Sequence, residues 1–178
     1  MLDTAVAYNR YKFLGNEFLT WLWYMIETDQ CWFRQLDQDF VSLTVGNRMV
    51  LENTLNNVKE SVTIKGDNAS LEEGRVALTK GALVTEVHVS YKAGAQNWEF
   101  SVKGESLNIS NLKLPETGPM EAPEDLEGVV IEKVYLIEKA IGLINLLFSH
   151  FIHLRLSNTW PHQTLSRIQK WAKSTTSN

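Results

Sequence analysis

Large apolar side chains recur at helical spacing near the start of the chain. Between about Leu14 and Thr28 they occur every three or four residues, at Phe18, Trp21, Leu22, Met25 and Ile26. This period marks one face of a helix. Leu19 and Trp23 make the opposite side apolar as well, so we predict a helix that is buried on more than one side.

The next segments alternate in the way of β-strands. Phe40–Val45 and Arg48–Asn53 flank Gly46-Asn47, a pair of residues suited to a tight hairpin turn. In Val58–Lys65 the apolar side chains occupy every second position, which is typical of a half-buried strand. The sequence therefore predicts a hairpin followed by a third strand.

A second helix-and-strand region follows. Ser70-Leu71-Glu72-Glu73 reads as a capping box at a helix start, and Gly81 can close that helix in the left-handed conformation. Alternating runs around Val87–Tyr91, Trp98–Val102 and Leu107–Leu114 then predict three more strands, with Ala93–Gln96 as a turn. This alternation gives each strand one solvent-exposed face, which favours an antiparallel sheet.

The C-terminal third is predicted to be helical. Residues 114–123 form a proline-rich loop, followed by a helix from about Glu124 to Leu156. Ser157-Asn158-Thr159 should break this helix and cap a second one, which opens with Trp160-Pro161 and ends near Lys173. We expect the two helices to form a long hairpin.

These elements define an α+β fold. We predict one domain over residues 1–178, with a helix and a sheet in 1–113, a loop in 114–123 and helices in 124–174. The antiparallel sheet should have about six strands with the helices packed on one side. The repeated order also suggests two similar βββ units, although no residue motif repeats.

Composition narrows the cellular setting. The chain has 178 residues and one cysteine, Cys31, which excludes a disulfide scaffold. The first thirteen residues lack the pattern of a secretory signal. The most apolar stretch, Ala140–Ile152, is too short and too interrupted to span a bilayer. We therefore expect a soluble cytoplasmic protein that does not associate with membranes.

Charge is distributed unevenly along the chain. The net charge is −4, but the last forty residues contain five bases and no acid, which leaves −9 for residues 1–138. In the last helix, Leu165, Ile168 and Ala172 can face the core, while Arg167, Lys170 and Lys173 recur every three residues on another side. Such a row can track phosphates. It can equally be an ordinary solvated helix face.

Possible catalytic and metal chemistry has weaker support. His150 and His153 are three residues apart on a helix and His162 follows the break, but no neighbouring acid or cysteine completes a metal site. The carboxylates that could serve a metal-dependent nuclease are Glu27, Asp29, Asp37, Asp39 and Glu52. Their spacing is not that of metal ligands, so we interpret them as solvated surface charges rather than as a metal site.

Other reactive or binding groups read better as structural. Cys31 has no basic partner in the sequence that would activate it. Trp21, Trp23 and Tyr24 could stack on nucleobases, but their apolar neighbours favour core packing. No phosphate-binding glycine loop or nucleophile elbow is present. We therefore expect no cofactor, no catalytic residue, no small-molecule substrate and no enzymatic activity.

The helix segment Phe13–Tyr24 reads FLGNEFLTWLWY, and Val45–Glu52 follows it. These two segments resemble the "FLG-x-EFLTWLW" helix and the hairpin after it in the C-terminal part of the RdgC-like, recombination-associated family. The remaining similar segments occur in the same order and are Arg75–Gly81, Asn111–Pro115 and Phe151–Trp160. The resemblance spans residues 13–160.

The resemblance implies a bacterial, nucleoid-associated protein that binds DNA with little sequence preference. Family members form a ring-shaped dimer and modulate RecA-driven recombination. Our first hypothesis is a DNA-binding domain of this type that forms a dimer with a second copy of itself. Its phosphate contacts would come from Arg155, Arg167, Lys170 and Lys173. The second is a protein-interaction or oligomerisation domain, motivated by the apolar Ala140–Ile152 stretch. A metal-dependent nuclease is the third.

Overall fold

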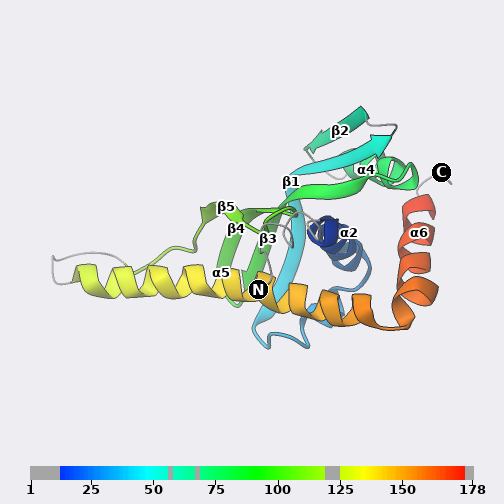
Figure 1. The fold of residues 1–178 in the computed structure, drawn as a ribbon. Coiled ribbons are helices and arrows are strands. Elements are labelled where there is room, and N and C mark those ends of the chain that lie inside the picture. Colours follow the sequence, from blue (N-terminus) through cyan, green and yellow to red (C-terminus); the bar gives the residue numbers. More distant parts are fainter. Residues whose placement is uncertain (1–12, 56–57, 67–68, 119–124, 175–178) are drawn as a thin grey trace, which may run out of the picture.

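The computed structural model describes residues 13–55, 58–66, 69–118 and 125–174. It has the expected α+β architecture, a five-stranded antiparallel sheet with helices on one face (Figure 1). The sheet order is β2-β1-β3-β4-β5. The strands are β1 (Phe40–Leu55), β2 (Val58–Lys65), β3 (Leu83–Ala93), β4 (Gln96–Lys103) and β5 (Ile109–Lys113).

The four predicted helices are present, together with a short helix, Gln30–Phe33, that the sequence did not predict. They are α2 (Phe13–Thr28), α3 (Gln30–Phe33), α4 (Ala69–Thr79), α5 (Leu126–Leu156), a π-helical turn η2 (Trp160–Thr164) and α6 (Leu165–Lys173). Residues 119–123 of the predicted loop, Glu124 and the N-terminal residues 1–12 lie outside the described part of the chain.

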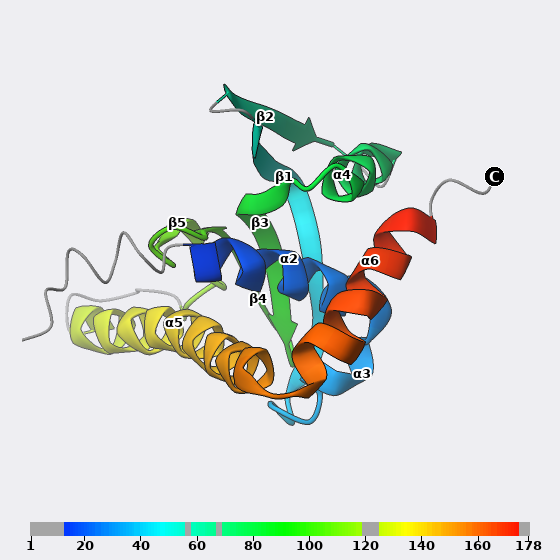
Figure 2. The same cartoon turned by 45° about the vertical axis from the view of Figure 1, so that its right-hand side comes forward.

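Helix α2 is the centre of the core, as its two apolar sides predicted. Phe18, Leu19 and Trp23 are fully buried. The helix lies between the sheet and the C-terminal helices (Figure 2). The buried Thr20 hydroxyl accepts a hydrogen bond from the Val84 amide at 3.0 Å, which ties α2 to β3. Burial on several sides explains why this helix needs no polar face.

The start of α2 touches the sheet backbone directly. A Cβ atom placed on Gly15 would lie 1.7 Å from the carbonyl oxygen of Gly104, just after β4. A Cβ on Gly104 would lie 2.3 Å from Asn16 Oδ1. Only residues without side chains allow this approach of two backbones.

The predicted hairpin at Gly46-Asn47 is wrong. Residues 40–55 form the single strand β1, which pairs with both β2 and β3 and has an irregularity in its β3 register between Val45 and Met49. Neither Gly46 nor Asn47 has the positive φ that a primed turn requires. A Cβ at Gly46 would lie 2.4 Å from the His88 ring, so any other residue there would have to displace that ring.

This correction changes the sheet. Because the two predicted strands are one, the described sheet has five strands rather than six, and β1 joins the two predicted βββ units into a single sheet. The turn at Ala93–Gln96 is confirmed, with Gly94 at φ +55° between β3 and β4.

Of the two predicted ends of α4, the C-terminal end is confirmed and the N-terminal end is not. The helix begins at Ala69, so Ser70 lies inside its first turn rather than at the capping position, and its side chain is outside the described part. The closing glycine is confirmed, since Gly81 has φ +90° and its amide donates to the Leu78 carbonyl at 3.0 Å.

The C-terminal helices do not form the expected hairpin. At the η2 corner, where Pro161 occupies the opening turn, the chain changes direction and α6 runs away from α5 to pack against α4 and α2 (Figures 1 and 2). The predicted break at Ser157–Thr159 is confirmed, but Thr159 makes no capping hydrogen bond with its side chain. The basic side of α6 is therefore separated from α5.

Helix α5 crosses the inner face of the sheet and extends past its edge (Figure 1). Its buried residues belong to the common core, and the Trp98 indole donates to the Leu136 carbonyl at 3.0 Å. By length and composition alone α5 could cross a membrane, and no other helix in the described ranges could. Its inner side packs into the core through Leu136, Ala140 and Leu147, and 33% of its apolar window is buried.

Candidate functional site

Three of the four predicted phosphate-contacting residues lie together on α6. Arg167, Lys170 and Lys173 are exposed, while Ile168 and Ala172 are buried on the opposite side. Arg167 and Lys170 make no ion pair within the described ranges. We call Arg167, Lys170 and Lys173 the α6 basic row.

Arg155 does not lie in this row. It is near the end of α5, where its Nε donates to the Glu17 carboxylate of α2 at 2.7 Å. Its guanidinium also lies 5.4 Å from the centre of the Trp160 ring. Arg155 is partly buried and has a structural role, since it joins α2, α5 and the η2 corner.

The carboxylates considered for a nuclease are dispersed among structural contacts. Glu27 pairs with Arg75, Asp29 accepts a hydrogen bond at the start of α3, and Glu52 pairs with Lys59 at 2.8 Å. No group of three histidine, cysteine or acidic side chains that could hold a metal occurs among the described residues. The geometry thus brings together none of the sets that the sequence suggested for metal chemistry.

The predicted histidine set is also dispersed. His153 contacts the Ser149 carbonyl through Nδ1 at 2.8 Å, and the His150 ring packs edge-on against Trp32. Cys31 is exposed on α3. Trp21 and Trp23 are buried in the core, which confirms the packing prediction for them.

Asp37 and Tyr91 form a polar contact at the edge of the core. The Tyr91 hydroxyl donates to Asp37 at 2.5 Å. Partial burial would raise the pKa of Asp37, but hydrogen bonds from Tyr91 and the Asp39 amide, together with the charge of Lys139, hold it below its usual value. Burial and the contact with Asp37 raise the pKa of Tyr91 strongly. Tyr91 thus stays protonated and acts as a structural donor.

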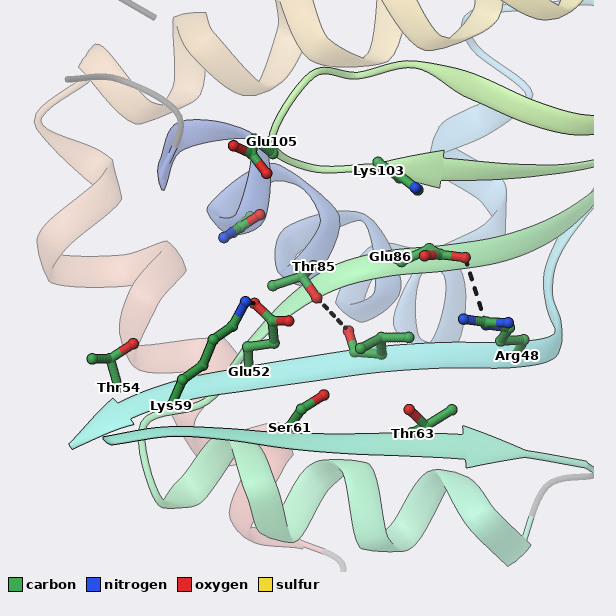
Figure 3. Close-up of a pocket in the computed structure, with 12 residues that line it drawn as sticks. Arg48, Glu52, Thr54, Lys59, Ser61, Thr63, Thr85, Glu86, Lys103 and Glu105 are labelled. Carbon is green, nitrogen blue, oxygen red and sulfur yellow. Dashed lines mark hydrogen bonds and ion pairs between the residues drawn. The ribbon is translucent and has the colours of Figure 1, made fainter. Parts of the chain in front are cut away.

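The open face of the sheet carries a polar hollow of about 630 Å³ (Figure 3). Six charged side chains line it, three of each sign, and they are Arg48, Lys59, Lys103, Glu52, Glu86 and Glu105. Lys59 pairs with Glu52, which raises the pKa of Lys59, and Arg48 lies 3.5 Å from Glu86. Because charges of opposite sign lie side by side here, the hollow offers no continuous basic track.

Helix α5 carries an apolar surface that the sequence reasoning misplaced. Of the apolar stretch Ala140–Ile152, Ala140, Leu143, Ile144, Leu147 and Phe151 are buried, while Ile141 and Leu146 are exposed. Exposed apolar side chains instead lie mainly in the first half of the helix. Val130, Val134, Ile137 and Ile141 are 49, 48, 37 and 45% exposed, and we call them the α5 apolar row. Their spacing of four, three and four residues was readable from the sequence.

Comparison of the chain with protein-family models, with curated proteins and with solved structures gives no match.

Proposed function

We propose that this chain is a non-enzymatic protein-interaction domain that self-associates through the α5 apolar row. The observation that carries the proposal is the exposure of four aliphatic side chains at positions 130, 134, 137 and 141, on a helix that extends past the sheet. This spacing is the one by which two helices interlock in a coiled coil. Monomeric proteins rarely leave such a continuous apolar surface uncovered.

The spacing is also symmetric, which favours a second copy as the partner. In an antiparallel pair related by a two-fold axis, Val130 would face Ile141 of the other copy and Val134 would face Ile137. Each layer then contains one valine and one isoleucine, so all layers have similar volumes. A two-fold interface of this kind uses the same patch on both copies.

The available area suits such an interface. With the exposed Leu126, Ile131 and Tyr135 beside it, the α5 apolar row offers on the order of 600 Å² of side-chain surface, against about 800 Å² per partner in a typical stable interface. Polar residues next to the row can contribute the remainder.

Sedimentation velocity at about 50 µM should test this proposal. We expect the wild-type protein at twice the chain mass of 20.3 kDa. Val134→Glu with Ile137→Glu should give the single-chain mass with an unchanged circular dichroism spectrum, because glutamates at the centre of an apolar interface must be desolvated. A matched control is Val62→Glu with Val76→Glu, two valines of similar exposure on β2 and α4. It should retain the wild-type mass.

A monomeric wild-type protein at this concentration would contradict the proposal. So would a double glutamate variant of α5 that sediments as the wild type does.

A second candidate function is sequence-nonspecific DNA binding through the α6 basic row, as the resemblance to RdgC-like proteins implies. Its support is the exposure of Arg167 and Lys170 on the side of α6 opposite the buried Ile168 and Ala172. Three cations at successive turns can contact successive phosphates and release their counterions.

Fluorescence anisotropy with a labelled duplex tests this second function. Three phosphate contacts predict a drop in affinity of about 40-fold between 50 and 200 mM salt. Replacing the α6 basic row by glutamine should abolish binding. The control replaces three other exposed lysines by glutamine, at Lys80, Lys92 and Lys133. Equal loss in both triple variants, or no binding by the wild type at 50 mM salt, would exclude the α6 basic row as a DNA contact.

A further inference from the structure

Strand β2 forms one edge of the sheet. In the described part of the chain it pairs with β1 alone, and no further strand lies beyond it (Figure 1). Its pairing with β1 is regular over all eight residues, without a bulge, and the strand contains no proline. Bulges, prolines and very short strands are devices by which proteins block such an edge. Because β2 has none of these three, its outer edge can accept another strand.

The ladder with β1 shows which backbone groups of β2 point outward. The Gly66 amide donates to the Asn47 carbonyl at 3.1 Å and continues the register of the two strands. Hydrogen-bonded and non-hydrogen-bonded pairs alternate along an antiparallel ladder, so the even-numbered residues of β2 bond to β1. The N–H and C=O groups of Ser61 and Thr63 therefore point away from β1. Both residues are exposed, and their backbone groups have no other partner within the described ranges.

An apolar groove of about 320 Å³ lies between the β1–β2 pair and α4. Val62 of β2 and Val76 of α4 line it from two sides and are 39 and 41% exposed. Its remaining apolar lining comes from Leu51, Ala77 and Ala82. We call it the β2–α4 groove. An apolar side chain that enters it would cover two valines that the fold itself leaves accessible.

The rim of the β2–α4 groove distinguishes between partners. Glu60 and Glu73 lie on it with Lys80, which gives two acids against one base. On this face a second copy of β2 offers Glu60, Val62 and Ile64, none of which can neutralise a glutamate. An inward-pointing charge is a device against the pairing of identical edges. A strand that carries bases on either side of an apolar residue complements this rim better than a second copy does.

From this arrangement we infer that β2 and the β2–α4 groove bind an extended segment of a partner protein, which adds to the sheet as a further strand. Its backbone bonds to the outward groups of Ser61 and Thr63. Since side chains alternate between the two faces, the partner residue opposite Val62 enters the groove and packs against Val76. Bases two positions before and after it approach the two glutamates of the rim. This surface is separate from the α5 apolar row, so neither proposal depends on the other.

A synthetic peptide tests this site by NMR on the full chain. The probe is Thr-Lys-Thr-Ile-Thr-Lys-Thr with blocked ends, in which isoleucine is the groove residue and the lysines are the flanking bases. We expect the amide resonances of Ser61 and Thr63 to move to lower field at millimolar peptide, because new hydrogen bonds form there. Hydrogen exchange at these two amides should slow, while the amides already bonded to β1 change less.

Methylation of the peptide backbone provides a matched control. In an antiparallel addition the two threonines next to isoleucine donate to β2, whereas the isoleucine amide points away from it. Methyl groups on those two threonine nitrogens should weaken binding about tenfold or more, because two hydrogen bonds are lost. A methyl group on the isoleucine nitrogen should leave the affinity nearly unchanged. Glutamate in place of both lysines should abolish binding, because like charges would then meet at the rim.

Substitutions in the protein test the same surface. Ser61→Pro blocks the edge without removing a bond to β1, because the Ser61 N–H points outward, and it should weaken binding about tenfold or more. Val76→Lys places a cation in the β2–α4 groove and should have a similar effect. Its control is Val41→Lys, at a valine of similar exposure near the opposite end of β1. Circular dichroism checks each fold, and Val76→Lys provides the test if Ser61→Pro does not fold.

Sedimentation separates this site from the proposed self-association. The variant with Val134→Glu and Ile137→Glu should bind the peptide as the wild type does, so the failure of self-association would leave this site intact. Ser61→Pro should sediment at the wild-type mass, and a lower mass would assign the edge to a second copy and overturn the partner segment. Absence of shifts at Ser61 and Thr63 at millimolar peptide, or equal binding of the two methylated peptides, would also overturn it.

Discussion

Two glycine-to-alanine substitutions should change stability in opposite directions. At Gly15, the new Cβ would lie 1.7 Å from the Gly104 carbonyl oxygen and 2.6 Å from its carbonyl carbon. Ordinary contacts of a Cβ atom with a neighbouring atom are about twice as long as the distance to the Gly104 oxygen. Because the obstructing atoms belong to the backbone rather than to a flexible side chain, α2 or the segment after β4 must move.

The size of the effect follows from two opposing terms. Overpacking a close contact costs about 1–3 kcal/mol and sometimes more, and here the overlap is at the severe end of that range. Alanine gains up to about 1 kcal/mol over glycine in a helix. We expect Gly15→Ala to lower the free energy of unfolding by about 2 kcal/mol, a sizeable part of a typical total of about 5–15 kcal/mol.

Gly142 provides the control within the same class of substitution. It is exposed in the middle of α5, and a Cβ there would meet no atom within 4 Å. Gly142→Ala should therefore raise the free energy of unfolding by about 0.5–1 kcal/mol through helix propensity alone.

Urea unfolding followed by tryptophan fluorescence measures both effects. With a slope of about 2–3 kcal/mol per molar urea, Gly15→Ala should lower the midpoint by about 1 M, and Gly142→Ala should raise it slightly. A Gly15→Ala midpoint at or above that of the wild type would show that α2 does not approach Gly104 as described.

Three further results are expected. Tyr91→Phe should lower the free energy of unfolding by about 1.5–3 kcal/mol in urea at pH 7, because the buried hydroxyl donates to the charged Asp37 at 2.5 Å. The folded state holds the pKa of Asp37 below 3.8, so its carboxylate stabilises the fold above that pH and loses this effect as the pH falls further. The difference in unfolding free energy between the wild type and Asp37→Asn should therefore narrow below pH 3.8. A difference that stays constant with pH would refute this. Arg155→Met should reduce stability through the lost contact with Glu17 yet leave duplex affinity unchanged, whereas Lys170→Met should do the reverse, as anisotropy and urea unfolding together would show.

The local sequence pattern was sufficient to predict an element where one physical cause acts over a short segment. Phe18, Trp21 and Leu22 recur at helical spacing because one side of α2 must meet the core, and that requirement holds whatever the partner is. The turn at Gly94 and the helix end at Gly81 follow equally from the conformational freedom of glycine, and both glycines have positive φ.

The same reasoning failed where glycine had another purpose. Gly46 followed by Asn47 has the composition of a tight turn, but the strand continues through it, and the His88 ring of β3 occupies the space that a side chain at Gly46 would need. A neighbour forty-two positions later in the chain imposes that constraint, and no local window contains both residues.

The candidate functional surfaces also divide into features that local spacing predicts and features that distant contacts decide. The row of Arg167, Lys170 and Lys173 was readable from three-residue spacing, because an amphipathic helix fixes which side faces away from its own buried residues. The loss of Arg155 from that row was not readable, because it depends on Glu17, at the other end of the chain.

The sequence by itself determined the class of fold, the positions of most helices and strands, and the exposed basic side of α6. Those features depend on side-chain period and backbone freedom, which act between near neighbours. The tertiary structure alone decided that β1 is one strand, that α6 leaves α5, that α5 keeps an uncovered apolar row, and that an apolar groove lies between β2 and α4. Each of these results depends on which distant surfaces meet, and burial and exclusion between distant segments are properties of the packed chain.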